Sequence, residues 1–108
     1  MKFGNGYDHN YVIGDHGGKR VSIATVYEPN SGRHMEVFSE EPAVQFYTGN
    51  FLDGKISGKN GHKYGFRTGF CLETHHYPDS PNQDKFPSTI LKLLELYRTS
   101  AVYKFSVR

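Results

Sequence analysis

Two β-branched segments flank a four-residue turn, and this pattern limits the fold more than any other part of the sequence. Val21 to Glu28 (VSIATVYE) and Arg33 to Ser39 (RHMEVFS) each have the length and residue types of a strand. Between them, Pro29-Asn30-Ser31-Gly32 combines a proline that fixes φ with a glycine that accepts positive φ. We therefore predict that the two segments pair as an antiparallel hairpin.

Short strand-like segments continue on both sides of this hairpin. Aromatic residues make up 15% of the chain, all of them Tyr or Phe, and 12 residues are glycine. Aromatic-rich segments separated by glycine turns are typical of all-β proteins. We expect further strands over Tyr7 to Ile13, Ala43 to Thr48, Phe70 to His75 and Tyr97 to Val107.

Two other segments have a different pattern. Gly49 to Gly65 is rich in glycine and lysine and has little apolar periodicity, so we predict a long exposed loop there. Apolar and aromatic residues at positions 90, 93, 94 and 97 instead recur with helical spacing. The conformation of Ile90 to Leu96 therefore stays open between helix and strand.

The bulk properties exclude several classes of protein. A length of 108 residues fits one small domain with no separate second domain. The formal net charge of only +2 argues against a nucleic-acid or membrane partner, and no apolar stretch is long enough to cross a bilayer. Cys71 is the single cysteine, which excludes an internal disulfide and favours a reducing, cytoplasmic compartment. Because Phe70 and Leu72 flank it, we expect Cys71 to be a small buried residue.

The histidines and glycines do not form a recognisable metal or cofactor motif. His75 and His76 are adjacent, and adjacent strand residues point to opposite faces, so the pair is unsuited to binding one ion. Asp8-His9 has the same geometry. The glycine-rich run from Gly14 to Lys19 lacks the spacing of a phosphate-binding loop and is better explained as a turn. We expect neither a metal nor a cofactor.

Three polar residues interrupt aromatic or apolar strand segments: Asp8 in GYDHNY, Gln45 in AVQFYTGN and Glu73 in FCLETHH. The ordinary explanation is that each occupies a solvent-facing strand position. The alternative is a polyol pocket, since a sugar requires aromatic faces together with a few convergent hydrogen-bonding groups. The residue pattern by itself leaves both explanations open.

Several longer segments carry a specific resemblance. They are GYDHNYV (Gly6 to Val12), SGRHMEVFSEEPAVQFYTGNFLDG (Ser31 to Gly54), GFCLETHHYPDSPN (Gly69 to Asn82), FPSTIL (Phe86 to Leu91) and YKFSV (Tyr103 to Val107). In this order and spacing, nearly the whole chain resembles the C-terminal part of the aldose 1-epimerase (galactose mutarotase) family. The resemblance implies that residues 1–108 are part of a large antiparallel β-sandwich that is incomplete in this chain.

The resemblance also implies roles for the three polar residues. Glu73 matches the glutamate that the family uses as catalytic base, Asp8 matches an aspartate that holds sugar hydroxyls, and Gln45 matches a glutamine lining the same site. The implied reaction interconverts the α and β anomers of an aldohexose such as galactose or glucose. The family's acid is a histidine in the N-terminal part, and no residue here matches its motif. The chain also has Leu93-Leu94 where the family carries Pro-Gly before the last strand.

An incomplete sandwich has consequences for activity and association. With the base but without the acid, we expect the chain by itself to be weakly active or inactive, and unpaired sheet edges to favour self-association. The alternatives are a non-enzymatic carbohydrate-binding module and an inert truncated product. Epimerisation of a hexose 6-phosphate would require converging arginines, which Arg20, Arg33 and Arg67 do not indicate. The rigid segment Pro78 to Pro81 is expected to brace the end of the strand that carries Glu73.

Overall fold

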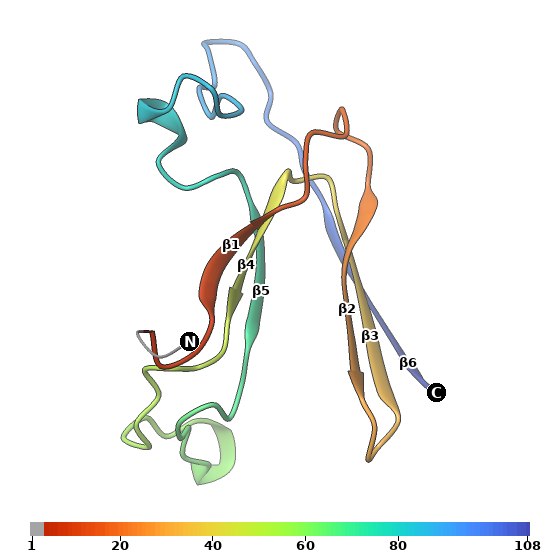
Figure 1. Ribbon diagram of the computed structural model, residues 1–108, viewed down its shortest axis with the longest axis vertical. Coiled ribbons are helices and arrows are strands. Elements are labelled where there is room, and N and C mark those ends of the chain that lie inside the picture. Colours follow the sequence, from red (N-terminus) through yellow and green to blue (C-terminus); the bar gives the residue numbers. More distant parts are fainter. Residues whose placement is uncertain (1–3) are drawn as a thin grey trace. The chain divides into compact units, whose positions relative to one another are not determined.

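The computed structural model describes residues 4–108, and strands dominate this part of the chain (Figure 1). The strands are β1 (Asp8–Val12), β2 (Val21–Glu28), β3 (Arg33–Ser39), β4 (Ala43–Tyr47), β5 (Cys71–His75) and β6 (Ala101–Val107). Two single-turn 3₁₀ helices, η1 (Lys59–Gly61) and η2 (Ser80–Asn82), lie in the connections. Residues 4–108 contain no α-helix, which confirms the all-β prediction.

The chain divides into two compact units. One contains the chain up to Tyr11 together with Gln45–Glu73, and the other contains Val12–Val44 and Thr74–Arg108. The strands form two three-stranded sheets, with the orders β1-β4-β5 and β2-β3-β6. Two small sheets agree with the expectation that the chain is a portion of a larger sandwich.

The β2-β3-β6 sheet contains the predicted hairpin. β2 and β3 pair antiparallel from Val21↔Ser39 to Glu28↔Arg33, with one irregularity between Ser22 and Ala24. The turn between them includes Gly32 at φ +70°, a left-handed conformation that favours glycine. β6 then pairs antiparallel with β3 along its whole length. Residue pattern and turn chemistry therefore predicted both strands with their observed bounds.

The β1-β4-β5 sheet has β4 at its centre. The Thr48 amide donates to the Tyr7 carbonyl at 3.1 Å and the Ile13 amide to the Pro42 carbonyl at 2.9 Å, so β1 and β4 run in opposite directions. Ala43 at the start of β4 is fully buried. All three strands lie within one or two residues of the ranges expected from the sequence.

The structure of the connecting segments matches the expectation for one of them and differs from it for another. The loop after β4 is mostly exposed, as predicted for Gly49 to Gly65, and backbone contacts such as the bridge between Ser57 and Lys63 and the hydrogen bond from the Gly54 amide to the Tyr64 carbonyl hold it together. The strand expected from Tyr97 begins only at Ala101. The segment expected as helix or strand is neither, and Leu93 and Leu94 are 92% and 97% exposed. These leucines do not pack against another part of the structure, so their helical spacing brings no buried face that would stabilise a helix.

Cys71 is a second correction. Its thiol is free and exposed rather than buried, because Cys71 lies at the first position of β5 while its apolar neighbours Phe70 and Leu72 fall on alternate positions.

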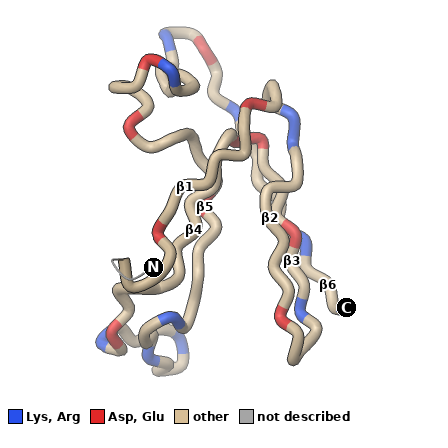
Figure 2. Tube along the Cα trace, viewed as in Figure 1, with Lys and Arg blue, Asp and Glu red and all other residues tan. Residues whose placement is uncertain are grey.

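Acidic and basic residues are interspersed along the described chain, as Figure 2 shows. Among the described residues, no helix has the length and hydropathy needed to cross a membrane.

Candidate sugar-binding and catalytic face

The three polar residues singled out from the sequence come from three different strands of one sheet. Asp8 begins β1, Gln45 is the central residue of β4, and Glu73 is the central residue of β5. All three lie in the same compact unit. Asp8 and Glu73 are exposed and Gln45 is half-buried, so solvent and small solutes can reach all three side chains.

Asp8 and Gln45 are joined directly. Nε2 of Gln45 donates to Oδ1 of Asp8 at 2.7 Å, although 37 residues separate them in the sequence. The contact fixes which end of the amide faces the carboxylate, and it leaves Oδ2 of Asp8 and Oε1 of Gln45 as acceptors. A hydrogen-bonded pair of this kind is suited to receiving hydroxyl donors from a polyol.

Aromatic contacts show which face of the sheet carries these residues. The Phe46 ring lies 5.2 Å from the Tyr7 ring and 6.3 Å from the Phe70 ring, measured between centroids. Neighbouring strand residues point to opposite faces, so the aromatic cluster occupies one face. Asp8, Gln45 and Glu73, each displaced by an odd number of positions, therefore share the other face.

The chain entering β1 is held by a hydrogen-bond network that the sequence did not reveal. The Tyr7 amide donates to Oγ1 of Thr48 at 3.0 Å, and Nδ2 of Asn50 donates to the Tyr7 carbonyl at 2.7 Å. The Thr48 hydroxyl also donates to Oδ1 of Asn50 at 2.7 Å. Gly6 is buried beside this network, and a Cβ there would lie 2.0 Å from Oδ1 of Asn50. The network sets the position of Asp8, two residues further along.

Comparisons with known proteins show the family of the chain. The family model described as aldose 1-epimerase matches residues 1–104. The chain belongs to the aldose 1-epimerase family. It is 48% identical to galactose mutarotase from Bos taurus and to that from Homo sapiens, covering 95% of this chain and 30% of each relative. It is 36% identical to aldose 1-epimerase from Escherichia coli K12, covering 93% of this chain and 29% of that protein. The chain thus spans about 30% of the length of these relatives.

One aromatic pair next to Gln45 was not predicted from the sequence of this aldose 1-epimerase family member. Tyr47 occupies the alternate position after Gln45 in β4, and its ring stacks against Phe51 with centroids 6.0 Å apart and an interplanar angle of 17°. The Phe51 amide also donates to the Tyr47 hydroxyl at 3.0 Å. Strand alternation within VQFYTGN was the signal that could have identified Tyr47 as a neighbour of Gln45.

The segment after β5 is stiffened by its own side chains. Asp79 has a left-handed backbone with φ +62°, and its carboxylate accepts from Nδ2 of Asn82 at 2.6 Å and Nε2 of Gln83 at 2.9 Å. These two hydrogen bonds lower the pKa of Asp79. The Ser80 hydroxyl donates to the Tyr77 carbonyl at 2.6 Å. These contacts favour a rigid Pro78 to Pro81 segment, and its role as a brace for β5 stays a prediction.

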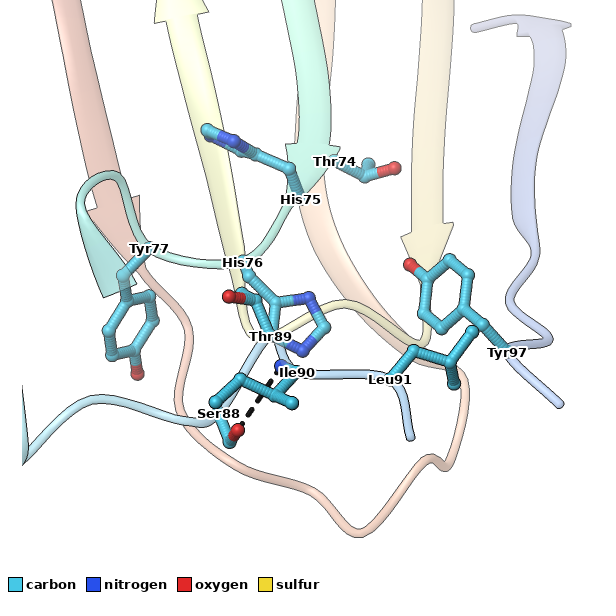
Figure 3. Close-up of a pocket in the computed structure, with 9 residues that line it drawn as sticks. All are labelled: Thr74, His75, His76, Tyr77, Ser88, Thr89, Ile90, Leu91 and Tyr97. Carbon is cyan, nitrogen blue, oxygen red and sulfur yellow. Dashed lines mark hydrogen bonds between the residues drawn. The ribbon is translucent and has the colours of Figure 1, made fainter. Parts of the chain in front are cut away.

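A separate pocket lies beyond the C-terminal end of β5 (Figure 3). Its volume is about 520 Å³, and it is bordered by Thr74, His75, His76, Tyr77, Ser88, Thr89, Ile90, Leu91 and Tyr97. In Figure 3 the side chains of His75 and Thr74 leave the strand in different directions. Among the described residues, no group of three His, Cys, Asp or Glu side chains is arranged to hold a metal ion.

The arginines relevant to the hexose 6-phosphate alternative have other contacts. Nη2 of Arg67 donates to the Asn5 carbonyl at 2.6 Å, and its guanidinium lies 4.8 Å from the Phe66 ring centroid. Arg20 lies 3.9 Å from a carboxylate oxygen of Glu40. These contacts do not favour a phosphate site.

Proposed function

We propose that this chain carries the catalytic base and part of the sugar-binding surface of an aldose 1-epimerase that interconverts the α and β anomers of an aldohexose such as galactose or glucose. The strongest support comes from the single face of the sheet to which strand alternation assigns Asp8, Gln45 and Glu73. These are the three positions that match the family's motifs, and they come from strands far apart in the sequence. In this proposal Glu73 is catalytic, and Asp8 and Gln45 bind substrate hydroxyls.

The proposed reaction consists of proton transfers around a ring opening. The Glu73 carboxylate removes the proton from the anomeric hydroxyl, the bond between the anomeric carbon and the ring oxygen breaks, and an acid protonates that oxygen. Rotation about the bond next to the resulting aldehyde exposes its other face. On reclosure the protonated Glu73 returns its proton to the anomeric oxygen, the attacking hydroxyl gives its proton back to the deprotonated acid, and the opposite anomer forms. Neither a metal nor a cofactor takes part.

The acid is the component for which this chain offers no candidate. The family's acid histidine has no matching motif in these 108 residues, and we do not assign that role to His9, His75 or His76. General acid–base catalysis contributes about 10² to 10⁴-fold per group, and orientation by the rest of the site contributes more. We therefore expect the chain by itself to bind an aldose weakly and to accelerate anomerisation little.

Polarimetry on freshly dissolved α-D-galactose tests the proposal. We expect a rate slightly above buffer that Glu73→Gln abolishes, while Asp8→Asn keeps part of the rate but weakens binding. Glu95→Gln is the matched control, because Glu95 is an exposed carboxylate outside the candidate face. A rate that Glu73→Gln leaves unchanged would contradict the role of Glu73. A rate far above buffer would instead contradict the need for a missing acid.

A carbohydrate-binding module is the second candidate, and the hydrogen bond between Asp8 and Gln45 favours it. That pair is oriented to receive sugar hydroxyls whether or not any turnover follows. Calorimetric titration with galactose separates the two functions, because binding without anomerisation indicates the module. An absence of both would indicate an inert product. A reducing compartment such as the cytoplasm stays a proposal that rests on the single cysteine of the sequence.

A further inference from the structure

A buried carboxylate lies outside the candidate face, and the proposed reaction does not use it. Glu41, in the short connection between β3 and β4, is only 3% exposed. Its amide donates to Oγ of Ser39 at 3.0 Å, which fixes the backbone of this connection. A carboxylate removed from water is costly unless other groups neutralise it and donate hydrogen bonds to it. The partners of Glu41 therefore indicate what its burial achieves.

Those partners come from two distant segments of the same compact unit. The Tyr97 hydroxyl donates to Oε1 of Glu41, and the Thr99 side chain also hydrogen-bonds to this carboxylate. Oε2 lies 2.7 Å from Nδ1 of His76, a distance typical of an ion pair, although the ring N–H is not well aligned with that oxygen. The rings of His76 and Tyr97 also meet edge to face, with centroids 6.4 Å apart. One side chain thus connects three parts of the chain.

The balance of forces keeps Glu41 ionised. Burial by itself raises the pKa of Glu41, but the hydrogen bonds from Tyr97 and Thr99 and the charge of His76 outweigh it and lower the pKa. The hydrogen bond to Glu41 in turn raises the pKa of Tyr97. Other titratable and charged groups border the groove of about 250 Å³ beside this cluster, namely Asp15, His16, Glu40 and Arg98.

The position of His76 gives the cluster its significance. His76 is the first residue after β5 and the third after Glu73. We propose that Glu41 is a positioning residue that, through His76 and Tyr97, anchors the chain where it leaves the strand carrying the catalytic base. The strand end is then fixed by side chains rather than by backbone pairing alone. This inference rests on the proposed function for its purpose, but its structural content can be tested without any sugar.

Hydrogen exchange of individual amides, followed by NMR, measures the anchor directly. Glu41→Gln retains the shape of the side chain but removes the charge. We expect amides of Thr74 to His76 and Tyr97 to Ser100 to exchange about tenfold faster in this variant, since buried donors lose an ionised acceptor. Glu40→Gln is the matched control. Glu40 accepts from the Ser100 hydroxyl at 2.8 Å but does not contact His76, so its replacement should leave Thr74 to His76 unchanged.

The pH dependence distinguishes an ionised anchor from a merely space-filling side chain. Because the folded-state pKa of Glu41 is lowered, its contribution is present above the unfolded pKa and is lost as pH falls through the folded value. Wild-type protection at Thr74 to His76, corrected for intrinsic exchange, should therefore fall in acid, whereas Glu41→Gln should show no such step. Identical pH profiles for the two proteins would overturn the proposal.

A milder variant keeps the test decisive if Glu41→Gln does not fold. Tyr97→Phe removes one hydroxyl and should raise exchange at the same amides roughly fivefold, the effect of one ordinary hydrogen bond. An unchanged rate there, or a uniform rise across all strands, would overturn the anchor. Because these readouts need no substrate, a failure of the anchor is distinguishable from a failure of the proposed mutarotase activity, which polarimetry with Glu73→Gln reports separately.

Discussion

The two sheets of this chain differ in regularity and in what they expose. In β2-β3-β6 the strands are seven or eight residues long, and β3 pairs along its length with both neighbours, with one irregularity opposite Ser22 and Ala24. In β1-β4-β5 each strand has five residues, and side-chain hydrogen bonds such as those of Thr48 and Asn50 supplement the pairing. The short sheet presents the three candidate site residues. The more regular pairing and the candidate site residues thus lie in different sheets.

The regular sheet has an apolar face that remains exposed. Its register places Val26 beside Met35 and Met35 beside Phe105, and it places Val37 beside Tyr103. Phe105 and Val107 are nevertheless 73% and 77% exposed. Exposed apolar faces and unpaired edge strands favour association with another molecule. The more regular sheet is therefore the one that we expect to determine how the chain behaves in solution.

Self-association is where the largest effect is expected. The chain should form dimers or larger species, and Phe105→Lys should raise the concentration at which they form by about tenfold or more, because a charge on the apolar face must be desolvated. Sedimentation velocity over a range of concentrations measures this. Val102→Lys is the matched control, since Val102 points to the opposite face of β6. If the wild-type chain is monomeric and melts in one sharp cooperative transition, the expectation that the regular sheet drives association is wrong.

An intermediate effect is expected at the entrance to the short sheet. Gly6→Ala would place a methyl group against the Asn50 side chain in a left-handed backbone conformation with φ +148°. We expect a loss of about 1 to 3 kcal/mol in the free energy of unfolding, measured by urea denaturation, together with weaker galactose binding.

Gly69→Ala is the control for the Gly6 variant. Gly69 lies in the same compact unit, and a Cβ there would have open space around it. Its effect should stay within about 0.5 kcal/mol. Equal losses for the two variants would mean that the network around Asn50 has no special importance for the sheet that carries the site.

Sequence predicted the β2–β3 hairpin of the regular sheet better than the side-chain contacts of the short sheet, for a physical reason. The bounds of Val21 to Glu28 and Arg33 to Ser39 depend on local residue types and on a turn, both of which can be recognised within a few residues. The hydrogen bond between Asp8 and Gln45 depends on how strands 37 residues apart align, which strand alternation alone does not determine. The family resemblance, rather than spacing, indicated that these residues belong together.

Two expectations from the sequence were wrong, and each has a specific physical cause. Cys71 was expected to be buried because its neighbours Phe70 and Leu72 are apolar, yet in a strand those neighbours point away from the face that Cys71 occupies. The strand expected from Tyr97 begins only at Ala101, and the side chains of Tyr97 and Thr99 instead hydrogen-bond to the buried Glu41. A contact with a residue 56 positions away thus overrides the local strand propensity.

The smallest effect concerns the turn that makes the regular sheet predictable. The Glu28 carboxylate accepts from the Ser31 hydroxyl and from the amides of Asn30 and Ser31 at 2.9 and 2.8 Å, and these hydrogen bonds lower the pKa of Glu28 to about 2. Since the folded pKa is depressed, the stabilisation of the turn is complete above the unfolded value and is lost as pH falls from there through about 2. Glu28 is fully exposed, so solvent keeps the contribution small.

A carboxyl-carbon NMR titration of the unsubstituted chain checks this prediction for Glu28. Glu28→Ala should loosen the turn slightly, visible as faster amide exchange at Asn30 and Ser31, and should leave the pairing of β2 with β3 in place. A Glu28 titration midpoint near 4.5 would show that the hydrogen bonds to Ser31 do not persist in solution. The turn would then depend on Pro29 and Gly32 alone, and the regular sheet would owe its register to strand pairing rather than to this carboxylate.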